Sequence, residues 1–266
     1  MKVRQPAVAG MFYPLETLKL QQQIEQMVKE SSLCGDKSQA CSHTVKALIV
    51  PHAGYRYSGV VAASAYSQLM DCAENYRHVI ILGPSHHVPF AGLALPSSTQ
   101  FETPLGIINV SATLIHEIMP LGTVQFLDEA HAREHSIEVQ LPFLQTLLPR
   151  FDILPLVVGM SNPEMIADIL EKLWDLPQIL IVMSSDLSHY HGYRDAVMLD
   201  HATSKAIIGK EWPITGEQAC GSEILNGFLL FASRRNLSIE ELILANSGDT
   251  GGDKEKVVGY GAYRIS

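Results

Sequence analysis

The chain has 266 residues, 47% of them hydrophobic and 18% charged, which is enough to bury a core and argues against a disordered, collagen-like or coiled-coil protein. Its 28 acidic and 19 basic residues give a formal net charge of −9 at pH 7, which disfavours a general nucleic-acid binder. No apolar run approaches the roughly 20 residues of a membrane span, and no apolar stretch with a cleavage site follows the first residues. We therefore expect a cytoplasmic protein without membrane association.

Apolar segments of strand type alternate with amphipathic segments of helix type along the chain. In the first half of the chain we expect a helix at 15–31, a loop at 32–44, a strand at 46–51, a helix at 58–70 with Ser58 as N-cap, strands at 78–83 and 106–110, and a helix at 111–119. A helical stretch then begins at Ser136, and Pro142 kinks or restarts it. In the second half we expect strands at 153–159 and 178–184, helices at 162–174, 194–209 and 220–234, and two final strands at 241–246 and 256–265. This alternation predicts an α/β fold in a single layered domain over 1–266, with a central mixed, largely covered β-sheet flanked by helices.

The cysteines and histidines indicate what kind of functional site the chain contains. Cys34, Cys41, Cys72 and Cys220 lack paired spacing, which argues against a disulfide scaffold and against a zinc finger. Cys34 and Cys41 lie in a polar stretch; they could pair under oxidation, but we expect free thiols in a reducing compartment. The eleven histidines fall mostly in short clusters, which points to a metal site or an acid–base site.

Histidines directly follow two of the expected strands. His52 follows the strand that ends near residue 50, and His86 and His87 follow the strand at 78–83. Neighbouring side chains in an extended segment point in opposite directions, so at most one of His86 and His87 should enter a shared site. Ligands of α/β proteins bind at the carboxyl ends of strands, so each of these segments is a candidate for one common site.

A third segment, SSDLSHYHG at 184–192, also follows an expected strand. Asp186 and His189 are three residues apart, and one helical turn would bring them to the same face. The pair could then act as acid and base, or Asp186 could hold the tautomer of His189. The alternative is an Asp N-cap with a solvent-facing histidine. His191 lies further into the loop and is the weaker candidate.

Two further features are ambiguous. Glu134, His135 and Glu138 lead into a helix, where acidic residues commonly serve the helix dipole, although they could instead orient a metal-bound histidine. Cys220 opens an expected helix, whose N-terminus would lower the pKa of its thiol. A buried small apolar residue is an equally good interpretation of Cys220. Three strand-end histidine segments together favour a metal site over separate structural roles.

These motifs, in their order and spacing, resemble the Memo family over nearly the whole chain. The matching segments are PAVAGMFYP, PHAGYRYSG, ILGPSHH, FETPLG, EHSIEVQLPFL, VMSSDLSH, ACG and VVGYGAYRI. The family in turn resembles the class III extradiol ring-cleaving dioxygenases in fold, without sharing their established activity. Those enzymes bind a mononuclear non-haem iron through two histidines and a carboxylate, with an outer histidine as acid–base catalyst.

The resemblance implies a metal site in this chain. His52 and His86 match the two histidine ligands, and Cys220 takes the third place, where the dioxygenases have a glutamate. Asp186 and His189 match the motif that holds the outer histidine. The implied cofactor is one iron(II) or copper ion per chain, with zinc as a further option. Because a thiolate is softer than a carboxylate and suits copper as well as iron, ring cleavage does not follow.

Three functions fit these residues. The first is a metal-dependent oxidoreductase acting on an unknown small molecule, with His189 as proton shuttle positioned by Asp186. The second is a non-catalytic binding module for a peptide or protein, because some members of the family that the chain resembles are adaptor proteins for phosphorylated peptides. The third is a hydrolase using zinc-bound water. Retention of both Asp186 and His189 favours an enzyme. The roles of nearby residues stay open: Arg56 and Arg133 could hold an anion, and Tyr55 and Tyr190 could stack on an aromatic ring.

Overall fold

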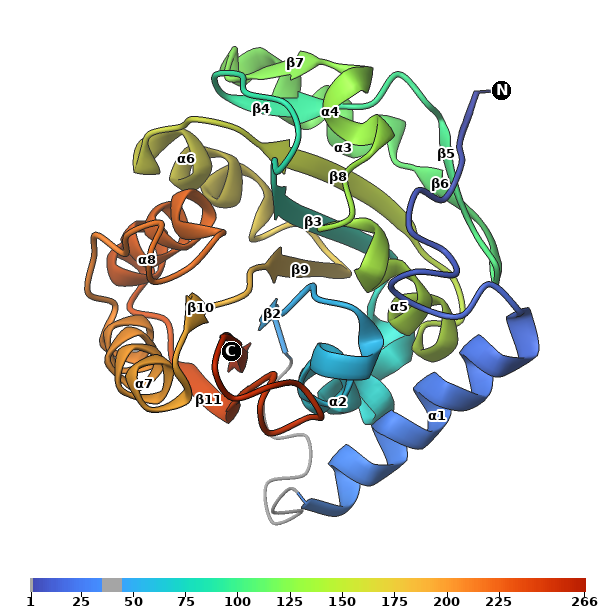
Figure 1. Ribbon diagram of the computed structural model, residues 1–266. Coiled ribbons are helices and arrows are strands. Elements are labelled where there is room, and N and C mark those ends of the chain that lie inside the picture. The colour runs from blue at the N-terminus through green and yellow to red at the C-terminus, as the bar shows by residue number, and fades with distance from the viewer. Residues whose placement is uncertain (1, 35–44) are drawn as a thin grey trace.

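A mixed β-sheet runs through the middle of the computed structural model, which describes residues 2–34 and 45–266 (Figure 1). The described residues build a 12-stranded sheet whose main path, in spatial order, is β1 (Val3–Arg4), β5 (Gln100–Thr103), β6 (Gly106–Val110), β8 (Asp152–Val158), β3 (His78–Pro84), β9 (Ile179–Ser184), β2 (Ala47–Val50), β12 (Val257–Ile265) and β10 (His189–His191). Beside this path, β12 also pairs with β11 (Ile239–Asn246), and β4 (Leu93–Leu95) pairs with β8 and β7 (Val124–Phe126). The central strands β6, β8, β3, β9 and β2 are parallel, and β12 is antiparallel to β2.

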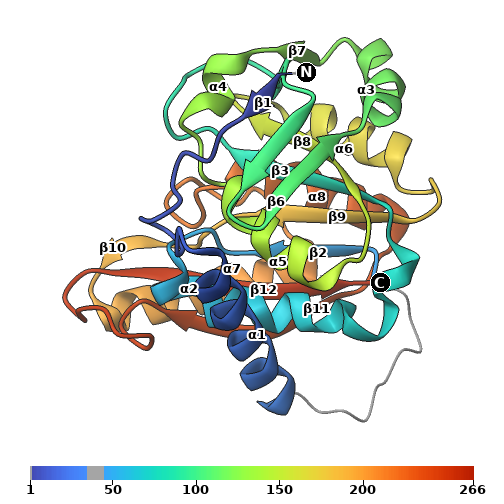
Figure 2. The same cartoon turned by 90° about the vertical axis from the view of Figure 1, so that its right-hand side faces the viewer.

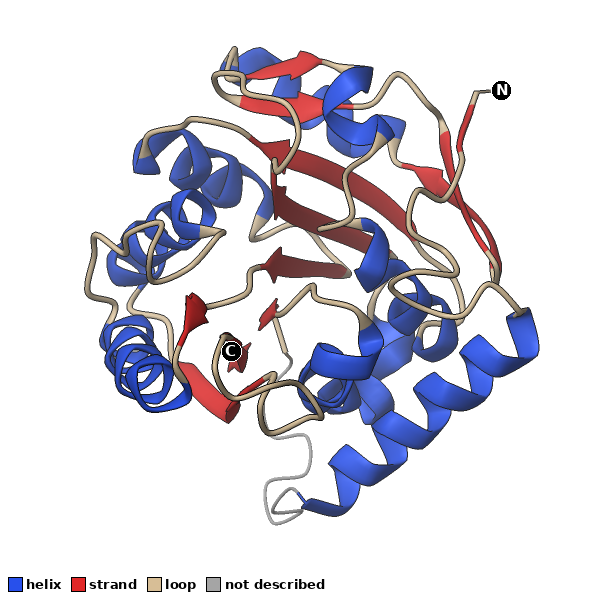
Figure 3. Ribbon diagram, viewed as in Figure 1, coloured by secondary structure: helices blue, strands red, loops and turns tan. Residues whose placement is uncertain are grey.

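Helices cover both faces of the sheet (Figure 3). One face carries α1 (Thr17–Cys34), α2 (Tyr55–Tyr66) and α5 (Leu141–Leu147), and the other carries α3 (Ala112–Ile118), α6 (Pro163–Leu173) and α8 (Ser222–Arg235). A view turned by 90° shows α1 and α5 in front of the strands (Figure 2). α7 (Tyr193–Gly209) packs against β11 and β12, and the shorter helices are η2 (Ser67–Asn75), η3 (Met119–Leu121), α4 (Asp128–Ala132) and η4 (Glu138–Gln140). The predicted α/β class with a mixed, covered sheet is confirmed.

The apolar strands explain why both faces are covered. Side chains alternate across a strand, so a strand that is apolar at every position presents an apolar surface on each side of the sheet. In β3, Val79 and Ile81 join the core cluster under α1, α2 and α5, whereas Ile80 and Leu82 join the cluster under α6 and α8. Each face therefore needs its own helical layer to exclude water.

Most of the expected long elements are present within a few residues of their predicted bounds, and the helix after Ser136 restarts near Pro142, at the N-terminus of α5. The strands β1, β4, β5, β7 and β10 were not expected. Each has only two to four residues, so their short sequences carry too little periodicity to be recognised. Four of them pair only with segments distant in sequence, whereas β5 also pairs with the next strand, β6.

The expected start of the second helix is wrong. α2 begins at Tyr55, three residues before Ser58, and its N-cap is Gly54, which makes no side-chain capping bond. Instead, the backbone N–H of Tyr55 donates to the carbonyl of Phe12 at 2.7 Å. Ser58 is buried inside the helix and donates its hydroxyl to Ala53 O at 2.8 Å. A contact from the N-terminal segment thus replaces the local cap.

The expected loop at 32–44 is only partly described. α1 extends to Cys34, so the helix is longer than predicted. Residues 35–44, including Cys41, and the thiol of Cys34 lie outside the described residues. Among the helices that are described, none combines the length and apolar character needed to cross a bilayer.

The close contact between α6 and α8 requires a glycine, Gly227, because there is no room for a side chain at this position. A Cβ atom at Gly227 would lie 2.4 Å from Ile166 Cβ and 3.0 Å from Pro163 O. We expect Gly227→Val to lower the free energy of unfolding by about 1–3 kcal/mol, because overpacking forces the two helices apart. Urea unfolding measures this. Gly216→Ala is the control, since a Cβ there meets nothing within 4 Å; equal stability of the two variants would contradict the packing argument.

Candidate metal centre

The site forms where three neighbouring parallel strands end. β2 ends at Val50, β9 at Ser184 and β3 at Pro84, and the sheet order is β3-β9-β2. Parallel strands end at the same edge of a sheet, so the segments that follow them meet. His52, Asp186 and His86 each come two residues after one of these strands.

A chain of buried hydrogen bonds sets the tautomer of His52. Its Nδ1 lies 2.9 Å from Ser184 Oγ. Ser184 donates its only hydroxyl proton to Ser136 O at 2.6 Å and accepts from Gln140 Nε2 at 2.9 Å. Gln140 Nε2 also donates to Pro51 O, a carbonyl that can only accept, which fixes the orientation of the amide. Ser184 has no proton left to offer, so His52 Nδ1 must be the donor.

The free electron pair of His52 is therefore on Nε2. Burial lowers the pKa of His52 well below its usual value, and the nearby His86 and His135 lower it further, so the ring is neutral. The backbone N–H of His52 donates to Asp186 Oδ1 at 2.7 Å, which ties the turn after β2 to the turn after β9. A neutral imidazole with an unprotonated Nε2 is the form that binds metals.

Glu134 performs the same task for His86. The carboxylate accepts from the backbone N–H of His86 at 2.7 Å and contacts its Nδ1 at 2.9 Å. Burial alone would raise the pKa of Glu134, but its hydrogen bond with His86, the charge of His86 and the backbone N–H groups of His86 and Ser136 bring it below its usual range. Nδ1 of His86 thus contacts an ionised acceptor, and Nε2 is the ring nitrogen left to face a metal ion. Of the two sequence-based interpretations of Glu134, orientation of a histidine is the one that the geometry supports.

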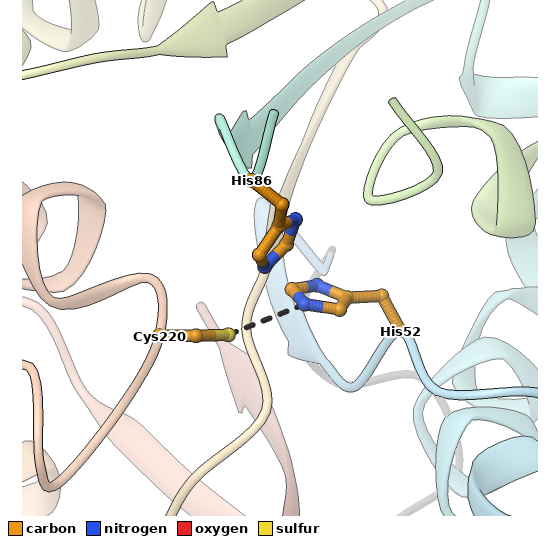
Figure 4. Close-up of side chains that lie close together, drawn as sticks. All are labelled: His52, His86 and Cys220. Atoms are coloured by element: carbon orange, nitrogen blue, oxygen red, sulfur yellow. Dashed lines mark hydrogen bonds between the residues drawn. The ribbon is translucent and has the colours of Figure 1, made fainter. Parts of the chain in front are cut away.

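Cys220 completes the group. Its Sγ lies 3.2 Å from Nε2 of His52, and the side chains of His52, His86 and Cys220 point toward one another (Figure 4). One donor atom from each of the three lies within 4.8 Å of the others. The Cys220 loop reaches this position because Gly221 sits against β9, where a Cβ would come 2.7 Å from Ser185 Cβ.

The expectation of a lowered thiol pKa at Cys220 is wrong for the metal-free site. α8 begins at Ser222, after Cys220, with Gly221 as its N-cap. Burial raises the pKa of the Cys220 thiol, and the negative charge of Asp186 raises it further. The thiol is therefore protonated until a metal ion displaces the proton.

The donor set suits a transition metal. Two imidazoles and a thiol that a cation can deprotonate are typical ligands for copper, iron or zinc, whereas magnesium and calcium prefer oxygen ligands. A hydrogen-bond partner also fixes each donor residue or its loop. Ser184 contacts Nδ1 of His52, and Glu134 contacts Nδ1 of His86. In the Cys220 loop, the hydroxyl of Ser185 accepts from Gly221 N at 3.0 Å. The residues present could hold one metal ion.

Asp186 and His189 lie near the group but not on a shared helical turn. Residues 185–188 are not helical and His189 opens β10, so the helical-turn prediction is wrong. Asp186 faces His52, with its Oδ2 4.0 Å from His52 Nε2, and burial raises its pKa to about 7. Nδ1 of His189 contacts Leu187 O at 2.8 Å, and within the described residues no hydrogen bond joins it to Asp186. The backbone of Leu187, and not Asp186, holds the His189 ring.

His135 forms a wall of the site. Its ring stacks on His86 with centroids 4.7 Å apart and packs against Phe12 at 4.7 Å. Burial lowers its pKa to about 4. His86, Glu134 and His135 form a second group with metal-ligand spacing. We assign this group to orientation, because Glu134 Oε1 already accepts the backbone N–H groups of His135 and Ser136 besides contacting His86.

Glu138 has a partner, Arg4, that the sequence analysis did not identify. Arg4 is buried, pairs with the buried Glu138, and donates to His131 O at 3.0 Å and Glu134 O at 2.6 Å. Glu138 also accepts hydrogen bonds from the N-terminal segment, namely from Ala7 N, Val8 N and Tyr13 Oη. This ion pair fastens the first residues of the chain to the loop that carries Glu134, so it serves the site rather than a helix dipole.

The other residues left open by the sequence contribute less to the centre. Tyr55 is buried and donates its hydroxyl to Val139 O at 2.6 Å, so it packs in the core instead of facing a ligand. Arg56, Arg133 and Tyr190 are exposed. His87 is exposed, as is His86, and the His87 ring lies 6.4 Å from the ring of His135, so exposure alone does not separate the two neighbours.

The fold and the site define an α/β protein with two histidines and a cysteine that form a candidate metal site at the carboxyl edge of its sheet. Comparison with known proteins agrees with this class. The family described as "Memo-like protein" matches residues 4–264. Proteins named "MEMO1 family protein" are 36% identical in Metallosphaera sedula and in Methanosarcina mazei, and 32% identical in Nitrosopumilus maritimus. Each alignment covers at least 99% of both chains. This chain belongs to the Memo family.

The network behind His52 makes a measurable prediction. Ser184→Ala removes the acceptor of His52 Nδ1–H and frees the ring to rotate and change tautomer, so metal affinity should fall by about 10–100-fold. Titration of the metal-free protein with Cu(II) or Fe(II) measures this. Ser64→Ala is the control, since its hydroxyl bonds only Val60 O of the same helix. Wild-type affinity in Ser184→Ala would contradict a role for this network in metal binding.

Proposed function

We propose that this protein is a mononuclear iron- or copper-dependent oxidoreductase that acts on a small molecule, with His52, His86 and Cys220 as metal ligands. The observation that carries the proposal is the convergence of three donor atoms within 4.8 Å from three separate segments. When bound, an iron or copper ion would supply redox chemistry and coordination positions open to a substrate.

The donor set favours a redox-active metal. A thiolate is a soft ligand that stabilises copper as well as iron, and the two imidazoles suit both. Because the resemblance implies that Cys220 takes the place of a carboxylate in dioxygenases, the proposal extends to oxidation–reduction and not to ring cleavage.

Two residues beside the ligands can handle protons. His189 contacts Leu187 O through Nδ1, which makes Nε2 its free nitrogen. Burial lowers its pKa, with a further contribution from His86, so His189 is neutral near pH 7 and can accept a proton. Asp186 is the second proton-transfer group, since its pKa is raised to about 7 by burial. Acid–base groups with a pKa near the working pH are the most effective.

The two alternatives would give different results. A zinc hydrolase would purify with zinc and consume no O₂. A binding module for phosphorylated peptides would bind its ligand without turnover, and with unchanged affinity in His189→Ala. Elemental analysis of protein purified without oxygen, followed by O₂ uptake with candidate substrates, separates these functions from the proposed one.

The ligand assignment predicts loss of metal in three variants. His52→Ala, His86→Ala and Cys220→Ser should each abolish stoichiometric metal binding while the protein stays folded. The oxidised protein loaded with Cu(II) should show an intense visible thiolate-to-metal band that Cys220→Ser lacks. Metal analysis, circular dichroism and absorption spectra measure these effects.

Matched variants control for this test. His87→Ala changes the exposed neighbour of His86, and Cys72→Ser changes a thiol that contacts Gln68 and Tyr76 and is not in the three-donor group, so both should keep the metal and the band. Full metal content in His52→Ala or His86→Ala would remove that residue from the ligand set. An unchanged band in Cys220→Ser would show that the thiolate of another cysteine binds the metal.

The proton-transfer role predicts a loss of rate without loss of metal. His189→Ala should keep one metal ion per chain and lower turnover by about 10²–10⁴-fold, the usual contribution of a general acid–base group. O₂ uptake with the substrate that wild-type protein consumes fastest measures this, and His191→Ala is the neighbouring control. Loss of metal in His189→Ala would make it a ligand. If no tested substrate supports uptake in wild-type protein, the oxidoreductase proposal fails.

A further inference from the structure

A cavity of about 260 Å³ lies directly beside the metal centre. It is bounded by the loop after β3, the end of β8 and the start of α8, and Cys220 forms part of its wall. Ser85, the residue before His86, lines it as well. A molecule in this cavity would therefore sit next to Cys220, the one of the three donor residues in its lining. The volume is slightly below the usual range for ligand pockets, about 300–1,000 Å³, so the occupant must be small.

Slightly more than half of the cavity wall is apolar. The apolar side chains that line it are those of Val88, Phe90, Val158, Met160 and Ile224, together with Pro84 and Pro89. Burying apolar surface against such a wall is favourable. The occupant should accordingly carry a compact hydrocarbon or aromatic body.

The charge of the lining has one sign. Glu223 lines the cavity, whereas no lysine, arginine or histidine does. Its carboxylate forms no hydrogen bond or ion pair with the described part of the chain, and it stands in the first turn of α8. Partial burial raises the pKa of Glu223, as expected for a carboxylate with little compensation. An anionic ligand, including a phosphorylated residue, would meet only repulsion from this side chain, while a cation would find a partner.

We propose that this cavity is the substrate pocket and that it takes a small apolar amine, whose ammonium group pairs with Glu223 while its apolar body packs on Val88 and Phe90. That the bound molecule is a substrate rests on the proposed metal-dependent function. The binding itself does not, so the two can be tested separately.

Three probes of matched shape and different charge test the pocket: 3-phenylpropylamine, 3-phenylpropan-1-ol and 3-phenylpropionate. Their affinities for the metal-loaded and the metal-free protein are measured by calorimetry at pH 7.5. We expect the amine to bind most tightly and the carboxylate least tightly in both forms. Glu223→Gln should weaken amine binding by about five-fold, the effect of one partly exposed charge pair. Glu223→Lys should reverse the order of amine and carboxylate.

Two further variants locate the site. Val88→Phe fills the cavity and should weaken binding of all three probes. Glu217→Gln removes an exposed charge near Cys220 in sequence but outside the cavity lining, so it should change nothing. If Glu223 serves only the dipole of α8, Glu223→Gln will shift the melting temperature without changing probe preference, and the proposal is overturned.

The other outcomes are equally decisive. Equal affinities for the three probes, no binding of the amine, or unchanged binding in Val88→Phe would each overturn the pocket assignment. Selective amine binding by a protein that takes up no metal would support the pocket and overturn the metal centre. An amine that binds only the metal-loaded protein would be a metal ligand rather than a partner of Glu223, which also overturns the assignment.

Discussion

Parallel pairing of β3, β9 and β2 is the constraint on which the site depends. The register aligns Val50 with Ser184 and Leu82 with Met183, so the three strands end at one edge. His52 and Asp186, which are 134 residues apart in sequence, thereby come within hydrogen-bonding distance. Both faces of the sheet are apolar and covered, and a slip by one residue would exchange the side chains that pack in the two core clusters.

Buried polar groups then convert this edge into a rigid site. A buried hydroxyl or carboxylate is costly unless its hydrogen bonds are satisfied. Ser184 meets this requirement with three partners, His52, Ser136 and Gln140, and Glu134 meets it with ring and backbone groups of the two loops that it joins. The same bonds that satisfy these groups also orient His52 and His86, so orienting the histidines requires no additional strain.

Burial controls the protonation of two of the three donor residues in the metal-free site. Burial keeps His52 unprotonated and the Cys220 thiol protonated, because charged forms are poorly solvated there. A cation that binds this group finds a free electron pair on Nε2 of His52 and must displace the proton of the Cys220 thiol. The N-terminal segment supports this arrangement at a distance, since the Arg4–Glu138 pair holds the loop that carries Glu134.

The sequence by itself determined the long elements, the α/β class and the identity of the segments that meet at the site. Apolar runs such as that of β3 report burial on both faces, and the turns after them carry histidines that the sheet must bring to its carboxyl edge. Only the tertiary structure decided how those side chains are held. At the start of α2 the carbonyl of Phe12 accepts a backbone hydrogen bond where we expected a cap from Ser58. His189 contacts Leu187 O instead of Asp186, and Glu138 forms an ion pair with Arg4. Burial also raises the pKa of Cys220, which its place before a helix led us to expect lowered. The physical reason is common to these cases. The hydrogen-bond partners and the burial come from segments far away in the chain, so the local spacing of residues cannot predict them.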